Sequence, residues 1–282
     1  MPQFITHGGQ TFSMPTTLLD EAVIRKQIQT PHTVAIDILP RVTSTIDWLK
    51  AKGAGLVCPH ICLAEEQTHG RGQMNRYWHT PFATNVNLSC AWLFQKEIQQ
   101  LEGLSLVVGI CVVRALAAYG LTKHVRVKWP NDIYWKNNKL AGILVDTESR
   151  GLGKTFAIIS VGLNVNMVPT FEDKISQAWT SLSLILGNPQ DRSKMAGLII
   201  DQLLTDLEVF DKQTFAAFVT DWQRHDYLRE KSVTLKNAQG TFSGVAKGID
   251  GRGHLLIRTD DGALMSHASG ELVKREFEVK KV

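Results

Sequence analysis

The sequence predicts an α+β protein in which helices cover a mixed or antiparallel sheet, with a small β-barrel at the C-terminus. Before Lys231, runs rich in β-branched residues and bounded by turn residues alternate with long apolar or amphipathic helix patterns. After Lys231, short strand patterns are separated by turn glycines. The 282 residues, 44% hydrophobic and 21% charged, suit a soluble protein with one large and one small domain.

The first elements are a short helix over 16–28, a strand over 32–39 and a capped helix. This second helix starts at Ser44 or Thr45, which can act as N-cap, and ends before Gly53. Further strands are expected at six places, namely 56–64, 86–93, 125–129, 133–136, 141–148 and 156–166.

Three longer helices are expected. The run 104–121 approaches the length of a membrane span, but Arg114 lies inside it and Gly120 near its end, which favours a buried core helix. The segments 193–210 and 213–228 have apolar residues at three- and four-residue steps and predict amphipathic helices.

Charge and cysteine content narrow the class of protein. The net charge of +4 is too small to indicate nucleic acid or a membrane as the main partner, and the N-terminus lacks the pattern of a secretory signal. The four cysteines lie in apolar runs, which favours buried thiols in a reducing cytoplasm over a disulfide or zinc site. We expect a cytoplasmic protein.

A glycine-rich basic loop occupies 68–89. Gly70 and Gly72 let the backbone approach a ligand, Arg71 and Arg76 can neutralise anions, and Trp78 offers a flat face for stacking. Taken alone, the loop fits equally well a mobile basic surface segment anchored by one tryptophan.

A second group of polar residues lies in 125–147. Pro130 ends a strand, Asn131 and Asp132 occupy the turn, and Lys139 starts an apolar strand. An ordinary hairpin with solvated charges explains the turn, but not a lysine at the start of a buried strand. That placement suits neutralisation of a phosphate.

A third group interrupts the apolar strand at 161–167. Gly162 permits close approach of a ligand, and the amides of Asn164 and Asn166 offer donors and acceptors. A β-bulge with satisfied asparagines accounts for this segment equally well.

These segments occur in a distinctive order: S-T, A-E-x-Q-x-x-G-R-G, a tryptophan, K-W-P-N-D, K-L-A-G-I-L-V and G-L-N-V-N. From about Val34 to the C-terminus the chain resembles the biotin protein ligases, or biotin–[acetyl-CoA-carboxylase] ligases. The resemblance implies a fold like that of class II aminoacyl-tRNA synthetases with an SH3-like C-terminal barrel. The implied domains are an N-terminal extension (1–33), a catalytic biotin- and ATP-binding domain (34–230) and the SH3-like domain (231–282).

The resemblance also implies a two-step reaction. Biotin and Mg-ATP form biotinyl-5′-AMP, and a lysine of a biotin carboxyl carrier domain then takes the biotinyl group. ATP and Mg²⁺ are thus the implied co-substrate and metal, and Asp132 is implied to assist either the metal or the incoming amine. The basic loop is expected to close over the intermediate and keep it from water.

Site residues follow from the resemblance position by position. The catalytic residues implied are Lys139, Arg71 and Asp132. Those for biotin are Ser44, Thr45, Ile46, Gln67, Arg71, Gly72, Gln73, Lys139, Gly142 and Gly162. Those for ATP are Trp78, Asn131, Asn164 and Arg76.

The chain departs from the family pattern in three places. The family loop usually reads G-R-G-R-x-G-R-x-W, whereas here Gln73 replaces the second arginine and Asn75 the third glycine. We expect weaker retention of the adenylate because a cation is missing. Ile46 replaces the asparagine of S-T-N, so it contributes apolar or backbone contacts only.

Some relatives carry an N-terminal winged helix-turn-helix, for which the 33 residues before the first strand leave no room. No specific DNA binding and no membrane association are therefore expected, and the protein is either a monomer or a homodimer.

Two alternatives remain open. A lipoate ligase or octanoyl transferase would share the fold, but the transferase needs a reactive cysteine, and no cysteine lies near the Lys139 hairpin. A non-catalytic biotin or nucleotide sensor would keep the pocket without needing Lys139.

Overall fold

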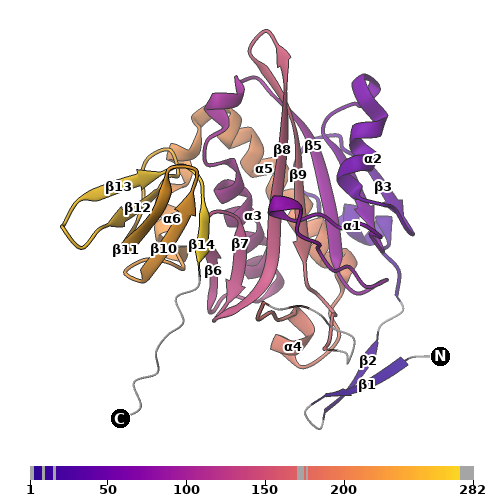
Figure 1. The fold of residues 1–282 in the computed structure, drawn as a ribbon. Coiled ribbons are helices and arrows are strands. Elements are labelled where there is room, and N and C mark those ends of the chain that lie inside the picture. Colours follow the sequence, from indigo (N-terminus) through magenta and orange to yellow (C-terminus); the bar gives the residue numbers. More distant parts are fainter. Residues whose placement is uncertain (1–2, 8–9, 15–16, 170–174, 176, 274–282) are drawn as a thin grey trace.

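The computed structural model describes residues 3–7, 10–14, 17–169, 175 and 177–273. Its main body is a seven-stranded sheet in the order β3-β4-β5-β9-β8-β7-β6 (Figure 1). Only β3 and β4 are parallel, so the predicted mixed sheet is confirmed. The strands are β3 (Ala35–Leu39), β4 (His60–Ala64), β5 (Val86–Phe94), β6 (Val125–Lys128), β7 (Asp132–Trp135), β8 (Asn138–Gly151) and β9 (Lys154–Leu163).

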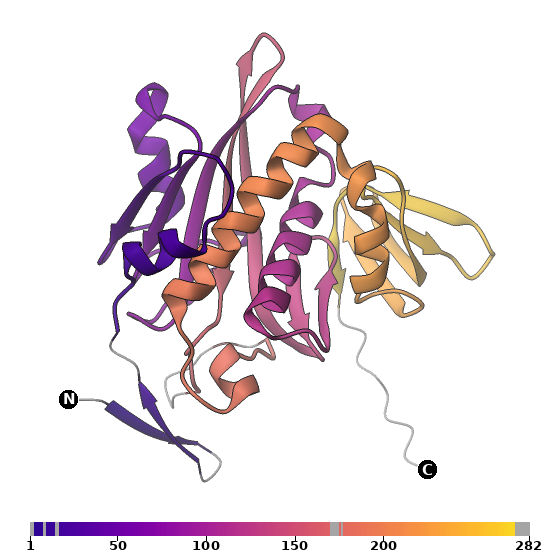
Figure 2. The same cartoon turned by 180° about the vertical axis from the view of Figure 1, so that it is seen from behind.

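Two long helices cover one face of this sheet. Helices α3 (Leu104–Tyr119) and α5 (Arg192–Gln213) lie side by side, with α1 (Glu21–Gln27) next to α5 (Figure 2). Within the described residues, only the segment Ile98–Tyr119 is long and apolar enough to span a membrane, and 67% of its most apolar window is buried in the protein. The predicted core helix is therefore confirmed, and it ends at Gly120 with a φ of 113°.

A single helix packs on the opposite face, at one end of the sheet. Helix α2 (Thr45–Lys52) places Ile46 and Leu49 against Cys62, Ala91 and Ile158. Because successive strand residues point to opposite faces, every second residue along β5 and β9 continues this surface. The α2 side of the sheet beyond these contacts stays open, and the cavity described below lies there.

The C-terminal strands form a separate antiparallel sheet in the order β13-β12-β11-β10-β14. This is the small β-domain that the sequence predicted, although no pairing closes it between β13 and β14 among the described residues. It docks on the main body through Trp129, whose Nε1 donates a hydrogen bond to the carbonyl of Gly253 at 3.1 Å. The strands are β10 (Ser232–Asn237), β11 (Gly240–Ile249), β12 (Leu255–Arg258), β13 (Leu264–His267) and β14 (Glu271–Val273).

The helix predicted over 213–228 is confirmed in part, since it is shorter than expected and begins with a 3₁₀ turn. Thr214 has a φ of 60°, which ends α5, and two short pieces follow: the 3₁₀ turn η4 (Phe215–Phe218) and α6 (Val219–His225). Burial of Phe215 and Phe218 holds the break against the core. The segment thus stays helical over 215–225 and is separate from α5, as the two predicted helices implied.

Other boundaries differ from the expectation by a few residues. Strand β4 starts only at His60, because Pro59 has no N–H for the ladder. A hairpin of β1 (Gln3–His7) and β2 (Gln10–Met14) was not predicted. The start of the predicted first helix, Thr16, and the tail 274–282 lie outside the described residues. The remaining short elements are η1 (Gly53–Gly55), η2 (Gln73–Asn75), η3 (Ile98–Leu101) and α4 (Leu182–Leu186).

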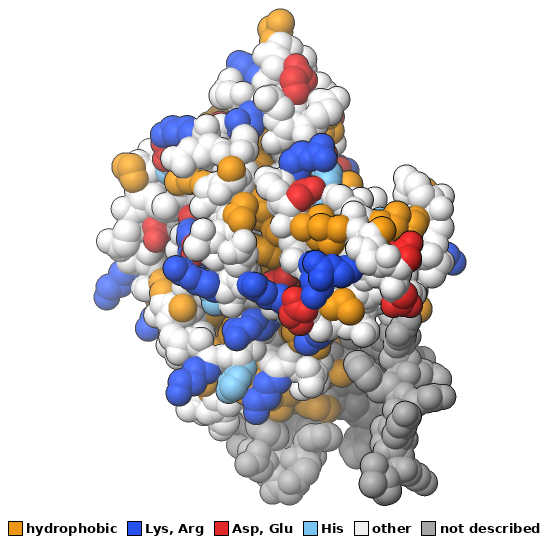
Figure 3. Space-filling view, turned by 90° about the vertical axis from the view of Figure 1, so that its left-hand side faces the viewer, with side chains coloured by type: hydrophobic (Ala, Val, Ile, Leu, Met, Phe, Trp, Pro, Cys, Tyr) orange, Lys and Arg blue, Asp and Glu red, His pale blue; other side chains and the backbone are white. Residues whose placement is uncertain are grey.

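The surface carries both signs of charge. On the face that presents the C-terminal domain, Lys and Arg side chains are spread out with acidic side chains among them (Figure 3). This distribution fits the modest net charge of +4.

Candidate active site

A cavity of about 1040 Å³ opens on the α2 side of the main sheet. Its walls come from the basic loop after Arg71, the turn after Lys128, and the strand β14 of the C-terminal domain. Every residue predicted for the site lines this one cavity, with the exception of Ser44. The three polar groups that the sequence analysis identified, in 68–89, 125–147 and 161–167, therefore converge on one cavity, as expected.

One row of paired residues crosses the floor of the cavity. Asn87 on β5 pairs with Gly162 on β9, and Gly162 pairs with Gly142 on β8. Gly142 then pairs with Asp132 on β7, and Asp132 with Lys128 on β6. Neighbouring strands lie ~4.8 Å apart, so the three steps from β5 to β7 place the backbone of Asn87 about 14 Å from that of Asp132. The two glycines leave a strip without side chains between them.

The indole of Trp78 lies on this glycine strip. A Cβ added to Gly162 would overlap Trp78 Nε1 and come within 2.6 Å of Cε2, and one added to Gly142 would lie 3.1 Å from Cζ3. The carbonyl of Gly70 accepts a hydrogen bond from Trp78 N at 2.9 Å, which fixes the backbone that carries the indole. Gly162 is thus required for the indole to lie on the floor, and Gly142 leaves room for the edge of its ring.

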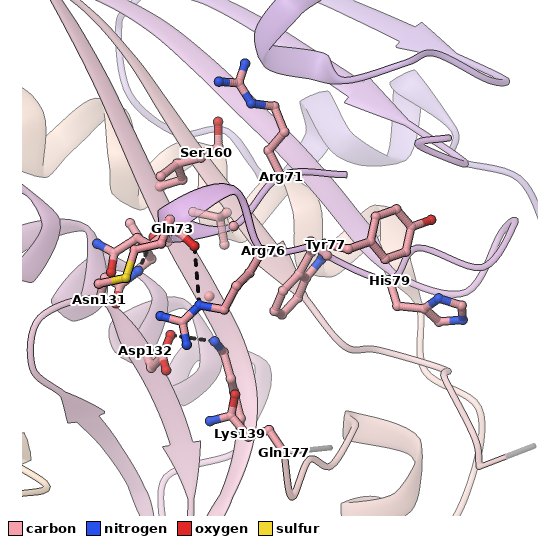
Figure 4. Close-up of a pocket in the computed structure, with 18 of the residues that line it drawn as sticks. Arg71, Gln73, Arg76, Tyr77, His79, Asn131, Asp132, Lys139, Ser160 and Gln177 are labelled. Carbon is pink, nitrogen blue, oxygen red and sulfur yellow. Dashed lines mark hydrogen bonds and ion pairs between the residues drawn. The ribbon is translucent and has the colours of Figure 1, made fainter. Parts of the chain in front are cut away.

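Lys139 and Asp132 form the charged end of the cavity. Lys139 Nζ lies 2.7 Å from Asp132 Oδ1, with side-chain exposures of 18% and 16%. The ammonium also lies over the Trp78 ring, 5.3 Å from its centroid. The backbone of Lys139 is held by Ala178 and Thr180, so the side chain starts from a fixed point. The dashed line between the two residues in Figure 4 marks the ion pair.

The two arginines of the basic loop are engaged elsewhere. Arg71 extends away from the Lys139–Asp132 pair and forms an ion pair with Asp47 of α2 at 2.6 Å (Figure 4). Arg76 lies 3.1 Å from Glu271 of β14 and donates to the carbonyl of Gln73 at 3.3 Å. The loop is therefore tied to α2 on one side and to the C-terminal domain on the other.

The opposite end of the cavity is a connected run of neutral polar groups. Gln67 Oε1 accepts hydrogen bonds from Thr45 N at 2.9 Å and Thr45 Oγ1 at 3.1 Å. Thr45 Oγ1 is 2.7 Å from Ser89 Oγ, which is 2.7 Å from Ser160 Oγ. Ser44 stays outside the cavity, fully buried, where its Oγ caps α2 by accepting from Ile46 N at 3.2 Å. Its contact with biotin stays a prediction.

Asn131 and Asn164 use their amides to fix the backbone around the cavity. Asn131 Nδ2 donates to the carbonyl of Ile143 at 2.7 Å, and Asn164 Nδ2 donates to that of Thr180 at 3.1 Å. Both side chains are buried at the cavity wall. Their contact with adenine stays a prediction.

Among the polar lining residues that the sequence analysis missed are Asn87, Ser160 and Glu271. The first two could have been found, because they share strand parity with Ser89 and with Gly162 respectively. Glu271 could not, since only the docking of the C-terminal domain brings it to the basic loop.

The cysteines do not form a reactive site. Burial raises the pKa of the Cys62 thiol to about 12 and raises the pKa values of Cys58, Cys90 and Cys111. None of the four lines the cavity. Within the described residues, no group of three or more His, Cys, Asp or Glu side chains could hold a metal ion.

Comparison with known families gives the class of the protein. Residues 38–166 match the biotin/lipoate A/B protein ligase family, and residues 230–275 match the biotin protein ligase C-terminal domain. The fold and the cavity thus define a protein ligase of the biotin and lipoate class.

Individual relatives narrow this class. The chain is 33% identical to the bifunctional ligase/repressor BirA of Salmonella typhimurium over 270 residues, which cover 96% of this chain and 82% of that protein. It is 29% identical to the biotin–[acetyl-CoA-carboxylase] ligase of Mycobacterium tuberculosis, covering 79% of this chain and 82% of the relative. A biotin protein ligase from Aquifex aeolicus, solved with biotin and ATP, superposes with a TM-score of 0.73 at 28% identity, covering 85% and 97% of the two chains. The chain belongs to the biotin protein ligase family.

Proposed function

We propose that this chain is a biotin protein ligase that works in two steps. In the first, the carboxylate of biotin attacks the α-phosphorus of ATP, giving biotinyl-5′-AMP and pyrophosphate. In the second, a lysine amine of a biotin carboxyl carrier domain attacks the biotinyl carbonyl, and AMP leaves. The observation that carries this proposal is the convergence of Lys139, Asp132 and Trp78 on one cavity whose far end is neutral and polar.

The charged end of the cavity is assigned to the reacting groups. Two anions, a carboxylate and a phosphate, must meet there, and the Lys139 ammonium can offset their repulsion and the charge that develops in the transition state. Asp132 holds that ammonium in place and can accept a proton from the incoming lysine amine. Arg71 would reach the same groups only after leaving Asp47.

The remaining roles follow the length of the cavity. Thr45 and Gln67 face the ureido ring of biotin, while Ile46, Gly72, Gln73, Gly142 and Gly162 border the rest of the molecule. Trp78, Arg76, Asn131 and Asn164 border the nucleotide. Magnesium is assigned to the ATP phosphates, with Asp132 as its candidate protein contact, because this carboxylate lies at the charged end of the cavity. The metal would neutralise part of the phosphate charge.

The domain division and the surroundings of the protein are part of the proposal. Residues 34–230 would form the catalytic domain and 231–282 the SH3-like domain, in line with the two family matches. Four free thiols, three of them buried, suit a reducing cytoplasm. The C-terminal domain contributes Glu271 and Leu272 to the cavity wall and so would help to enclose ATP.

The rival acyl enzymes are less well supported. A cysteine-dependent octanoyl transferase needs a thiolate near the acyl group, whereas all four thiols have raised pKa values and lie outside the cavity. A lipoate ligase would need the same charged end. The dithiolane ring of lipoate, however, has no N–H or C=O group that could form hydrogen bonds with the polar end of the cavity.

The proposal is tested by measuring the release of pyrophosphate from ATP in the presence of biotin, lipoate or octanoate. Biotin should support release, with lipoate and octanoate far behind. Release with lipoate or octanoate but not with biotin would overturn it.

A further inference from the structure

The polar end of the cavity has a fixed pattern of donors and acceptors, which follows from counting protons. Three oxygen–oxygen contacts join Gln67 to Thr45, Thr45 to Ser89, and Ser89 to Ser160. Gln67 Oε1 carries no proton, so the three hydroxyls must supply one proton to each of the three contacts. Only one direction satisfies all three, and in it Thr45 donates to Gln67, Ser89 to Thr45, and Ser160 to Ser89.

Ser160 is therefore an acceptor toward the cavity. Its proton is used by Ser89, and among the described residues no donor reaches its remaining lone pair. Gln67 has the opposite character, because its Oε1 already accepts twice, while its Nε2 meets no acceptor in the described part of the chain. Both side chains line the cavity.

Asn87 supplies a second acceptor. Its Nδ2 donates to the carbonyl of Ala64 at 3.2 Å, and since a carbonyl can only accept, this bond fixes the orientation of the amide. Its Oδ1 is buried and accepts no hydrogen bond from any described residue. The side chain is 1% exposed, lines the cavity and stands beside the side-chain-free position Gly162.

We propose that Asn87 and Ser160 are specificity-determining residues that select an acid whose head carries two N–H donors. With Gln67 Nε2 as the donor for a carbonyl, the cavity presents the complement of a cyclic urea, which has one C=O and two N–H groups. An acid with an alkyl or dithiolane head leaves Asn87 Oδ1 buried and unpaired, which disfavours its binding. The inference rests on the proposed function and names the groups that choose its substrate.

Direct binding tests this without depending on catalysis. Titration calorimetry gives the Kd values of biotin, desthiobiotin and octanoate for the wild-type chain and for the variants Asn87→Leu and Ser160→Ala. Desthiobiotin keeps the cyclic urea and lacks the sulfur. If a variant weakens the binding of both biotin and desthiobiotin, the effect is assigned to the urea. Ser149→Ala, at the exposed end of β8 and outside the cavity, is the matched control.

Each variant should weaken biotin and desthiobiotin by about tenfold, as expected for one lost hydrogen bond, and leave octanoate unchanged or tighter. Equal weakening of all three acids would show a structural role and overturn the inference. Wild-type protein that binds octanoate as well as biotin, or no biotin at all, would overturn it as well. Failure of the proposed function has a different signature, namely bound biotin without pyrophosphate release.

Discussion

Lys139 Nζ and Asp132 Oδ1 lie 2.7 Å apart on adjacent strands, and both side chains are largely buried at one end of the cavity. The turn between β6 and β7 places the aspartate, and the start of β8 places the lysine. A buried ammonium held by one carboxylate is available to a second anion at little cost in reorganisation. This pair is the feature on which the chemistry of the first step depends.

Replacing Lys139 by alanine should lower the rate of biotin-dependent pyrophosphate release by about 10²–10³-fold, because a preorganised cation is lost where charge develops. Biotin affinity, measured by calorimetry, should change little. Lys50→Ala removes an exposed lysine paired with Asp146 outside the cavity and serves as control. Unchanged release in the Lys139 variant would contradict the catalytic role of Lys139, whereas biotin binding without any release by the wild-type chain would favour a sensor over an enzyme.

Replacing Gln73 by arginine should slow the release of biotinyl-5′-AMP. Gln73 lines the cavity in the segment tied by Arg76, and an added guanidinium there supplies a charge-assisted contact to the phosphate. Filtration of single-turnover mixtures, followed by counting of labelled adenylate, measures the dissociation rate. Equal rates for the two proteins would refute the idea that glutamine weakens retention.

Replacing Gly162 by alanine should push the Trp78 indole off the floor, because a Cβ there would overlap its Nε1. We expect a KM for ATP raised by about tenfold or more and a change in tryptophan fluorescence. Gly251→Ala is the matched control, since nothing lies within 4 Å of its added Cβ. Normal ATP affinity together with unchanged fluorescence would show that the indole does not depend on the glycine strip.

Acid should destabilise the C-terminal domain through His267. Burial lowers the pKa of this histidine below its ordinary value of 6.5, and its ring packs against Phe242. The unfolded chain then binds the proton at higher pH than the folded one, so stability is full above 6.5 and falls as pH drops below it. Urea unfolding at about pH 7.5 and about pH 5.5 should show a smaller acid loss for His267→Gln than for wild type. An identical acid loss in wild type and His267→Gln would contradict this assignment. The exposed-site control His69→Gln should lose as much stability as wild type, and a reduced loss there would also contradict it.

Much of the site could be predicted because its residues are close together in the sequence. Asp132 and Lys139 sit on one hairpin, and the glycines of the loop lie only a few residues before Trp78. The strands and the core helix were visible in the apolar patterns. Once these strands pair into one sheet, their polar residues face the same cavity.

Other features depend on pairing between distant strands and could not be predicted. The alignment of Asn87 with Gly162 and then Gly142 is a matter of register across β5, β9 and β8. The contact between Arg76 and Glu271 depends on domain docking.

The most direct test of the account is the mass of an acceptor. A biotin carboxyl carrier domain is incubated with biotin, Mg-ATP and either the wild-type chain or Lys139→Ala, and intact-mass spectrometry follows the carrier. The account predicts that the wild-type protein adds one biotinyl group to a single lysine and that the variant adds almost none. A carrier that keeps its original mass with the wild-type protein, or that is modified equally by both proteins, would contradict it.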